Sequence, residues 1–145
     1  MIKISGQRIL NRPPHELWGL LMDPAVMRRC IPGCKRFEVL EPGRYQIALQ
    51  VSFGLLKGAF QGEAQLKDVV NLERYRLEMD TRGKTGCIQG ATDVRLHTLD
   101  GGEQTEIVYQ SDAKVSGVLA SVGARLFQGA ARSFADRFFD ELVEL

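Results

Sequence analysis

The sequence lacks the features that mark several large classes of protein. It has only three cysteines among 145 residues, and so low and odd a number argues against a disulfide-stabilised secreted fold and for free thiols in a reducing compartment. Nineteen Lys and Arg residues nearly balance eighteen Asp and Glu residues, for a formal net charge of +1. The chain therefore has neither the basic excess expected of a nucleic-acid-binding protein nor the charge of an acidic disordered chain.

Long hydrophobic runs are also missing. The longest uncharged stretch of the C-terminal third, residues 115–124, is far shorter than the ~20 apolar residues that a membrane-spanning helix needs. The first residues alternate as a strand does and contain no apolar signal-peptide segment. We therefore expect a soluble, cytoplasmic protein.

No repeat, low-complexity tract or linker divides the chain, so residues 1–145 are expected to form a single domain. Because 44% of the residues are hydrophobic, this domain can form a core without a disulfide or a structural metal.

The hydrophobic period predicts the order of the elements. Residues 3–10 are expected to form a strand, and Pro13 and Pro14 then break the pattern and begin a short helix that ends near residue 21. Asp23, followed by a proline, predicts the start of a second short helix. From residue 35 to residue 115 apolar and polar residues alternate, which predicts five or six antiparallel strands joined by short turns.

After residue 117 the hydrophobic period becomes that of a helix and stays so to the end of the chain. About 27 residues at 1.5 Å each predict a helix of roughly 40 Å, long enough to cross a whole sheet. Since this is the only long amphipathic element, the sheet is expected to curl around it and to bury its apolar face there.

The residues expected on the inner face are small, and this leaves two interpretations open. Gly90, Ala113 and Gly123 are among the positions that supply little volume to a close-packed core. Either the helix and a strongly curved sheet approach each other closely, or a cavity remains, with a wall expected to include Trp18, Tyr45, Leu49, Phe60, Met79, Ile88 and Tyr109.

Groups for catalysis or metal binding are scarce. Cys30 and Cys34 are separated by a Pro-Gly pair and, with His15, make a poor zinc site, so we expect no metal and no cofactor. His97 falls on the polar side of its strand, and no inward Asp, Glu or His is found. We therefore name no catalytic residue, and this favours binding over catalysis.

Several ordered motifs resemble those of the CoxG family, named after the CoxG subunit of carbon monoxide dehydrogenase. They extend through essentially the whole chain, and they are GQRI at 6–9 before a helix with Trp18, DP at 23–24, CIPGC at 30–34, FGLLKGAFQG at 53–62, GKTGCIQG at 83–90 and VSGVLASVGARL at 115–126.

The resemblance implies an α+β fold of the START-like, or SRPBCC, superfamily. This helix-grip fold wraps a curved antiparallel sheet around a long C-terminal helix, with two short helices after the first strand. The resemblance also implies a carrier of a hydrophobic, lipid-like molecule such as a quinone, working with molybdenum hydroxylase subunits of the carbon monoxide dehydrogenase type. It further implies peripheral contact with the inner face of the membrane, although the C-terminal membrane-attached extension of some members does not follow Leu145.

On this hypothesis the apolar side chains of the inner face line the cavity, and a few polar ones orient the ligand. The expected ligand-binding residues are Arg8, Trp18, Tyr45, Leu49, Phe60, Met79, Ile88, Tyr109, Leu119 and Val122. Two alternatives stay open: a cyclase- or dehydratase-type enzyme of the same superfamily, and a docking module whose core is filled. The sequence does not identify the ligand, the partner enzyme or the oligomeric state.

Overall fold

The computed structural model describes residues 1–54 and 56–145, so Leu55, which belongs to the motif at 53–62, lies outside the described residues. The elements follow the predicted order. They are β1 (Ile2–Leu10), α1 (Pro14–Leu21), α2 (Pro24–Cys30), β2 (Cys34–Glu41), β3 (Arg44–Phe53), β4 (Leu56–Val70), β5 (Arg74–Gly83), β6 (Gly86–Leu99), the 3-10 turn η1 (Asp100–Gly102), β7 (Gln104–Ser116), the 3-10 turn η2 (Val118–Val122) and α3 (Ala124–Val143).

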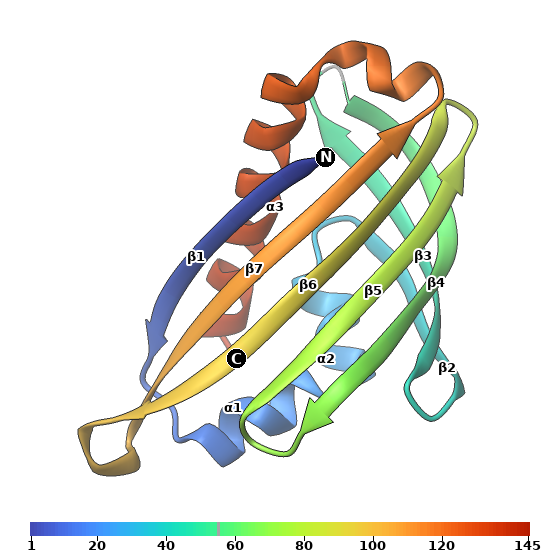
Figure 1. The fold of residues 1–145 in the computed structure, drawn as a ribbon. Coiled ribbons are helices and arrows are strands. Elements are labelled where there is room, and N and C mark those ends of the chain that lie inside the picture. The colour runs from blue at the N-terminus through green and yellow to red at the C-terminus, as the bar shows by residue number, and fades with distance from the viewer. Residues whose placement is uncertain (55) are drawn as a thin grey trace.

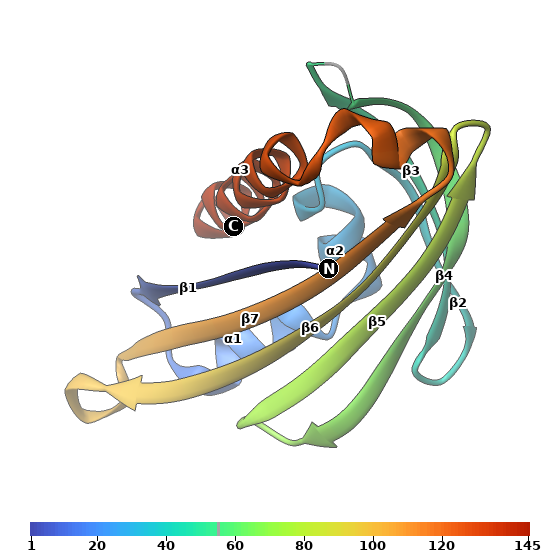
Figure 2. The same cartoon turned by 45° about the horizontal axis from the view of Figure 1, so that its top comes forward.

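The strands form one antiparallel sheet in the order β1-β7-β6-β5-β4-β3-β2. Strands from β2 to β7 are joined to their sequence neighbours as a meander, and β1 returns to the free edge of β7. The sheet curls, and α3 crosses its open side (Figures 1 and 2). The helix-grip fold implied by the sequence is therefore confirmed.

The two short helices close one end of the curled sheet, the lower end in Figure 1. We call this end the base. Each helix has a proline in its first turn, and the Asp23 carboxylate accepts a hydrogen bond from the Ala25 N–H at 2.9 Å, which caps α2. The i, i+1, i+4 spacing of Leu17, Trp18 and Leu21 turns these three side chains inward, where all are buried.

The last helix is shorter than the sequence predicts. It has 20 residues rather than about 27, because Gly117 (φ 82°) and Gly123 (φ 93°) adopt torsions that L side chains rarely reach and separate η2 from α3. In the first turn of α3 after this break, Leu126 is 39% exposed while Phe127 is buried. The helical period of the sequence predicts one apolar stripe through Leu119, Val122, Leu126 and Ala130, and the exposure of Leu126 shows that this prediction is wrong at that residue.

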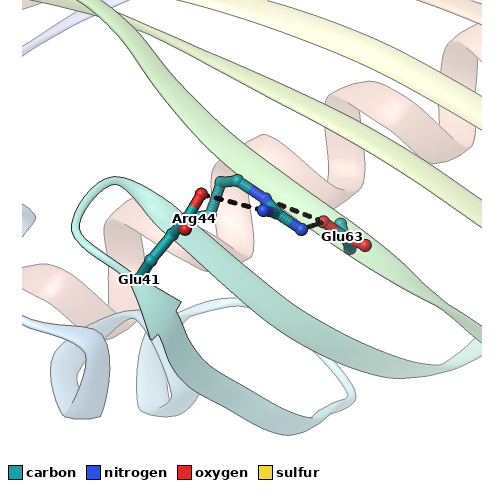
Figure 3. Close-up of polar contacts among 3 residues, drawn as sticks. All are labelled: Glu41, Arg44 and Glu63. Carbon is teal, nitrogen blue, oxygen red and sulfur yellow. Dashed lines mark hydrogen bonds and ion pairs between the residues drawn. The ribbon is translucent and has the colours of Figure 1, made fainter.

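The outer face of the sheet carries the polar half of each strand. There Arg44 of β3 donates hydrogen bonds to Glu63 on β4 at 2.7 Å and to Glu41 on β2 at 2.8 Å (Figure 3). These bonds raise the pKa of the Arg44 guanidinium above its ordinary value. The three side chains connect the β2–β3 hairpin to the neighbouring strand β4 and lie on the face away from α3.

Candidate functional site

The buried side chains form two hydrophobic clusters instead of one continuous core. The larger cluster fills the base, with Leu17, Trp18 and Leu142 among its members. The smaller one, made of Leu56, Phe60, Leu119 and Phe127, lies where η2 and the start of α3 meet the sheet. We call this second end the apical end. A cavity of about 270 Å³ is lined by residues of both clusters, so the protein's own side chains leave space between them.

Small residues on both sides account for this space. Gly90 and Ala113 on the strands and Ala131 and Ala135 on α3 all line the cavity. A Cβ atom added at Gly90 would meet only the Asp112 carbonyl oxygen, at an ordinary 3.5 Å. By contrast, a Cβ at Gly62 would lie 1.8 Å from the Asp80 carbonyl oxygen, so Gly62 allows a close backbone approach. Both interpretations of the small residues therefore apply, at different positions.

The cavity wall gathers most of the aromatic side chains of the protein. Eight of the eleven aromatic residues line it, and they are Phe53, Phe60, Tyr75, Tyr109, Phe127, Phe134, Phe138 and Phe139. Because aromatic rings present large, flat apolar surfaces, this wall is suited to a ligand that contains a ring system.

Few polar side chains interrupt the apolar wall. Thr81 donates a hydrogen bond to the Ile88 carbonyl at 2.9 Å, and the hydroxyls of Thr92 and Ser111 bond to each other at 2.7 Å. Burial raises the pKa of the Tyr75 and Tyr109 phenols, so both stay neutral. The wall can therefore offer hydroxyl groups to a ligand in a largely apolar space.

Charged side chains lie at the margins of the cavity. Lys57, which follows the β3–β4 turn, is exposed at the apical end. The alternation of β7 places the Asp112 side chain on the outer face, opposite to Ser111 and Ala113. Its Oδ1 atom is buried without a hydrogen-bond partner among the described residues. No histidine lines the cavity in the part of the chain that the structure describes.

Six of the ten residues expected to bind a ligand line the cavity. They are Leu49, Phe60, Met79, Ile88, Tyr109 and Leu119. Tyr109 is held over β1, where the absence of a side chain at Gly6 makes room for its ring.

The other four expected residues lie elsewhere. Trp18 packs edge-on against Tyr75, with ring centroids 5.8 Å apart, and Tyr45 packs on Phe37 at 4.8 Å, so both belong to the base. Val122 packs against the apical cluster and does not line the cavity.

Arg8 faces the last turns of α3 and not the cavity. Its guanidinium lies 3.0 Å from the Asp140 carboxylate and 5.4 Å from the centroid of the Phe139 ring. The charge of Arg8 is therefore already paired, and its place in the structure offers no cation to a ligand in the cavity.

The sequence pattern did not reveal the Thr92–Ser111 pair as a site feature. Both residues were visible as small or polar members of inward-facing positions, but only the register of β6 against β7 brings them opposite each other. Phe134, Phe138 and Ala131 were also missed as cavity residues, although their helical spacing could have placed them on the inner face of α3.

Cys30 and Cys34 are not among the residues that line the cavity. Cys30 is buried in the base, and burial raises the pKa of its thiol to about 11, with a smaller contribution from Glu141. Burial also raises the pKa of the Cys34 thiol, which donates a hydrogen bond to the Arg36 carbonyl at 3.2 Å. No group of three or more His, Cys, Asp or Glu side chains suited to a metal occurs within residues 1–54 and 56–145.

The apical end is basic and partly apolar. Lys57, Arg82, Lys84 and Arg125 lie in the segments that meet there, and Val118 of η2 is 75% exposed. The Leu119 N–H donates a hydrogen bond to the Thr85 carbonyl at 2.8 Å, which connects η2 to the β5–β6 turn. The segments 52–62, 81–92 and 113–135 contain no Asp or Glu.

Comparisons with known proteins agree with this architecture. The sequence model of the family of the carbon monoxide dehydrogenase CoxG subunit matches residues 6–144. A conserved protein from Geobacillus kaustophilus has a similar structure, with a TM-score of 0.93 and 26% sequence identity over 99% of this chain and 93% of that one. A search of curated proteins finds no match.

Two more distant structures share the fold. The Zhui aromatase/cyclase from Streptomyces sp. R1128 has a TM-score of 0.73 and 14% identity over 98% of this chain and 91% of that one. A START superfamily protein from Mycobacterium smegmatis has a TM-score of 0.71 and 14% identity over 98% of this chain and 94% of that one. Among the described residues, no helix has the length and apolar character needed to cross a bilayer.

Proposed function

The chain belongs to the family of the carbon monoxide dehydrogenase CoxG subunit, and on that premise we propose that it is an accessory protein that carries a neutral hydrophobic molecule, such as a quinone, in its cavity. The observation that carries the proposal is the apolar space of about 270 Å³ between the two core clusters. The alternative, a docking module, is expected to have a filled core without such a space.

The wall suits this ligand chemistry because it is apolar and aromatic and, among the residues that the structure describes, has no free cation at its centre. Burial of apolar ligand surface supplies about 25 cal/mol per Å². A volume of about 270 Å³ is at the small end of ligand sites. A ring with a short substituent fits, and a long isoprenoid tail has to leave the cavity.

The first experiment asks whether a hydrophobe binds at all. Purified protein is extracted with solvent and analysed by mass spectrometry, and delipidated protein is then titrated with menadione, a naphthoquinone. Trp18, the single tryptophan, reports binding because it packs against Tyr75 of the cavity wall. We expect saturable quenching of its fluorescence. Absence of both a co-purified hydrophobe and saturable quenching would refute the carrier function.

A pair of variants makes this titration specific to the cavity. Gly90→Leu places a side chain in the cavity and should abolish quenching by menadione. Ala59→Leu adds a similar group at an exposed position and should leave the titration unchanged. Equal titrations for the two variants would place the quinone outside the cavity.

We propose that the partner is a molybdenum hydroxylase of the carbon monoxide dehydrogenase type, and that the carried quinone accepts its electrons. Family membership supports this partner. The test is reduction of carried menadione by such an enzyme, followed by absorbance, with the Gly90→Leu protein as the control. A rate that does not depend on the wild-type carrier would contradict the partnership.

We propose that the protein acts in the cytoplasm, with its apical end in peripheral contact with the inner face of the membrane. The exposed Val118 and the acid-free basic segments around it support this contact, since each Lys or Arg near an anionic bilayer contributes about 1 kcal/mol. Lys84→Glu should weaken binding to phosphatidylglycerol-containing vesicles about fivefold or more. Arg95→Glu, near the other end of β6, should not. Equal flotation of both variants would contradict this orientation.

An enzymatic role of the cyclase or dehydratase type would need a group that moves protons. Burial raises the pKa of the Tyr75 and Tyr109 phenols, which makes neither of them a base near neutral pH. We therefore propose binding without chemical change. Recovery of menadione, or of the co-purified hydrophobe, in altered form after incubation with the purified protein would favour the enzyme instead.

A further inference from the structure

The hydroxyl pair on the inner face of the sheet has one hydrogen-bond donor to spare. Thr92 on β6 and Ser111 on β7 face each other in register, with their oxygens 2.7 Å apart. Two hydroxyls carry two protons, and their mutual bond uses one of them. No other hydrogen bond of either side chain occurs in the part of the chain that the structure describes. The second proton is therefore available to an acceptor in the cavity, which both residues line.

The other polar groups of the wall are less suited to this task. The Thr81 hydroxyl already donates to the Ile88 carbonyl. The Tyr109 hydroxyl lies over Gly6 at the β1 edge, and Tyr75 lies beside Trp18 at the base. The Thr92–Ser111 pair thus lies on β6 and β7, between Leu77 on β5 and Ile4 on β1 in the register of the sheet.

The charges around the pair define the ligand group further. Arg8 is paired with Asp140, and Lys57 lies at the apical end, so neither offers a cation beside the pair. Asp112 follows Ser111 in sequence, but its side chain lies on the outer face and supplies no positive charge to the pair. A neutral acceptor fits this setting, and the carboxylate of a fatty acid does not.

We infer that Thr92 and Ser111 anchor the ligand by donating a hydrogen bond to a neutral carbonyl oxygen on a flat ring, held between strands β6 and β7 and the phenylalanines of α3. This inference rests on the proposed carrier function and specifies its ligand class. An apolar ring alone fills the wall, but only a ring ketone or quinone also uses the spare donor, which is costly to leave without a partner in an apolar space.

The test compares two probes with the same ring and different oxygen content. Menadione has two carbonyl groups, and 2-methylnaphthalene has none. Their dissociation constants are measured with delipidated protein, with laurate as an anionic third probe. We expect the wild-type protein to bind menadione about five- to tenfold more tightly than the hydrocarbon, as one hydrogen bond contributes, and to bind laurate weakly.

Variants of the pair then assign this preference to the two hydroxyls. Thr92→Val with Ser111→Ala removes both, and we expect the menadione preference to disappear while affinity for 2-methylnaphthalene does not fall, because no donor is then left without a partner. Each single variant should keep most of the preference, because the remaining hydroxyl no longer has a partner and can donate to the ligand. Thr105→Val is the control, since that buried β7 hydroxyl donates to the Arg12 carbonyl outside the cavity wall.

The outcomes separate the anchor from the carrier function. A protein that binds neither ring refutes the carrier function and the anchor together. A protein that binds both rings equally, or a double variant that retains the preference, overturns the anchor alone. Urea midpoints show that each variant is folded, and Thr105→Val should lower its midpoint without changing the ratio of the two affinities.

Discussion

Filling the cavity with one larger helix side chain should stabilise the ligand-free protein. Ala131 lies on the inner face of α3 and lines the cavity. Ala131→Leu adds three carbons, and at about 0.8 kcal/mol for each buried carbon the gain is at most about 2.4 kcal/mol. Because Ala and Leu have similar helix propensities, the gain has to come from the cavity. We expect the free energy of unfolding to rise by about 1–2 kcal/mol.

The measurement is urea unfolding of delipidated protein, followed by far-UV circular dichroism. The m-value, the slope of the unfolding free energy against urea concentration, should be the same for each variant. Ala25→Leu, at an exposed position of α2, should stay within about 0.5 kcal/mol of the wild type. If the interior were filled by the protein's own atoms, Ala131→Leu would overpack it and lower stability by about 1–3 kcal/mol. A loss of that size would refute the cavity and with it the carrier function. The same variant should weaken menadione binding.

Three further predictions concern residues outside the cavity wall. Leu142→Ala, at a fully buried position of the base, should lower the free energy of unfolding by about 2–5 kcal/mol in urea titrations. Arg8→Gln loses the contacts with Asp140 and Phe139 but should leave menadione affinity unchanged by fluorescence titration, and a weakened affinity would return Arg8 to the ligand site. Since burial raises the pKa of Cys30 from 9.0 to about 11, stability should be full below pH 9 and fall between pH 9 and pH 11 as the unfolded thiol ionises first. Urea midpoints across that range should fall less steeply for Cys30→Ala, and equal slopes would contradict the assignment.

Alternation along the strands predicted which face of the sheet each residue lies on, but not its depth, that is, how far it lies from the base. Tyr45 and Leu49 share the inner face of β3, and they lie four residue steps, or about 13 Å, apart along the strand. That distance places Tyr45 against Phe37 in the base and Leu49 in the cavity wall. A period of two does not distinguish these positions, because depth depends on where α1 and α2 close the sheet.

The helix break at Gly123 shows a different limit. Its glycine lies within a continuous apolar stripe, and such a stripe predicts an unbroken helix. Gly117 and Gly123, both with positive φ, flank η2, and the Leu119–Thr85 hydrogen bond connects η2 to the β5–β6 turn. This contact joins segments that are distant in sequence, so the local hydrophobic pattern does not predict it.

The amino-acid order alone determined the strand and helix types, the inward face of each strand and the family, because hydrophobic period and local motifs are short-range properties. The tertiary structure decided which inward residues line the cavity and which pack against each other. It paired Arg8 with Asp140, brought Thr92 opposite Ser111, and left a cavity beside small residues such as Gly90. These outcomes depend on register, curvature and the path of the last helix, which arise only when the whole chain packs.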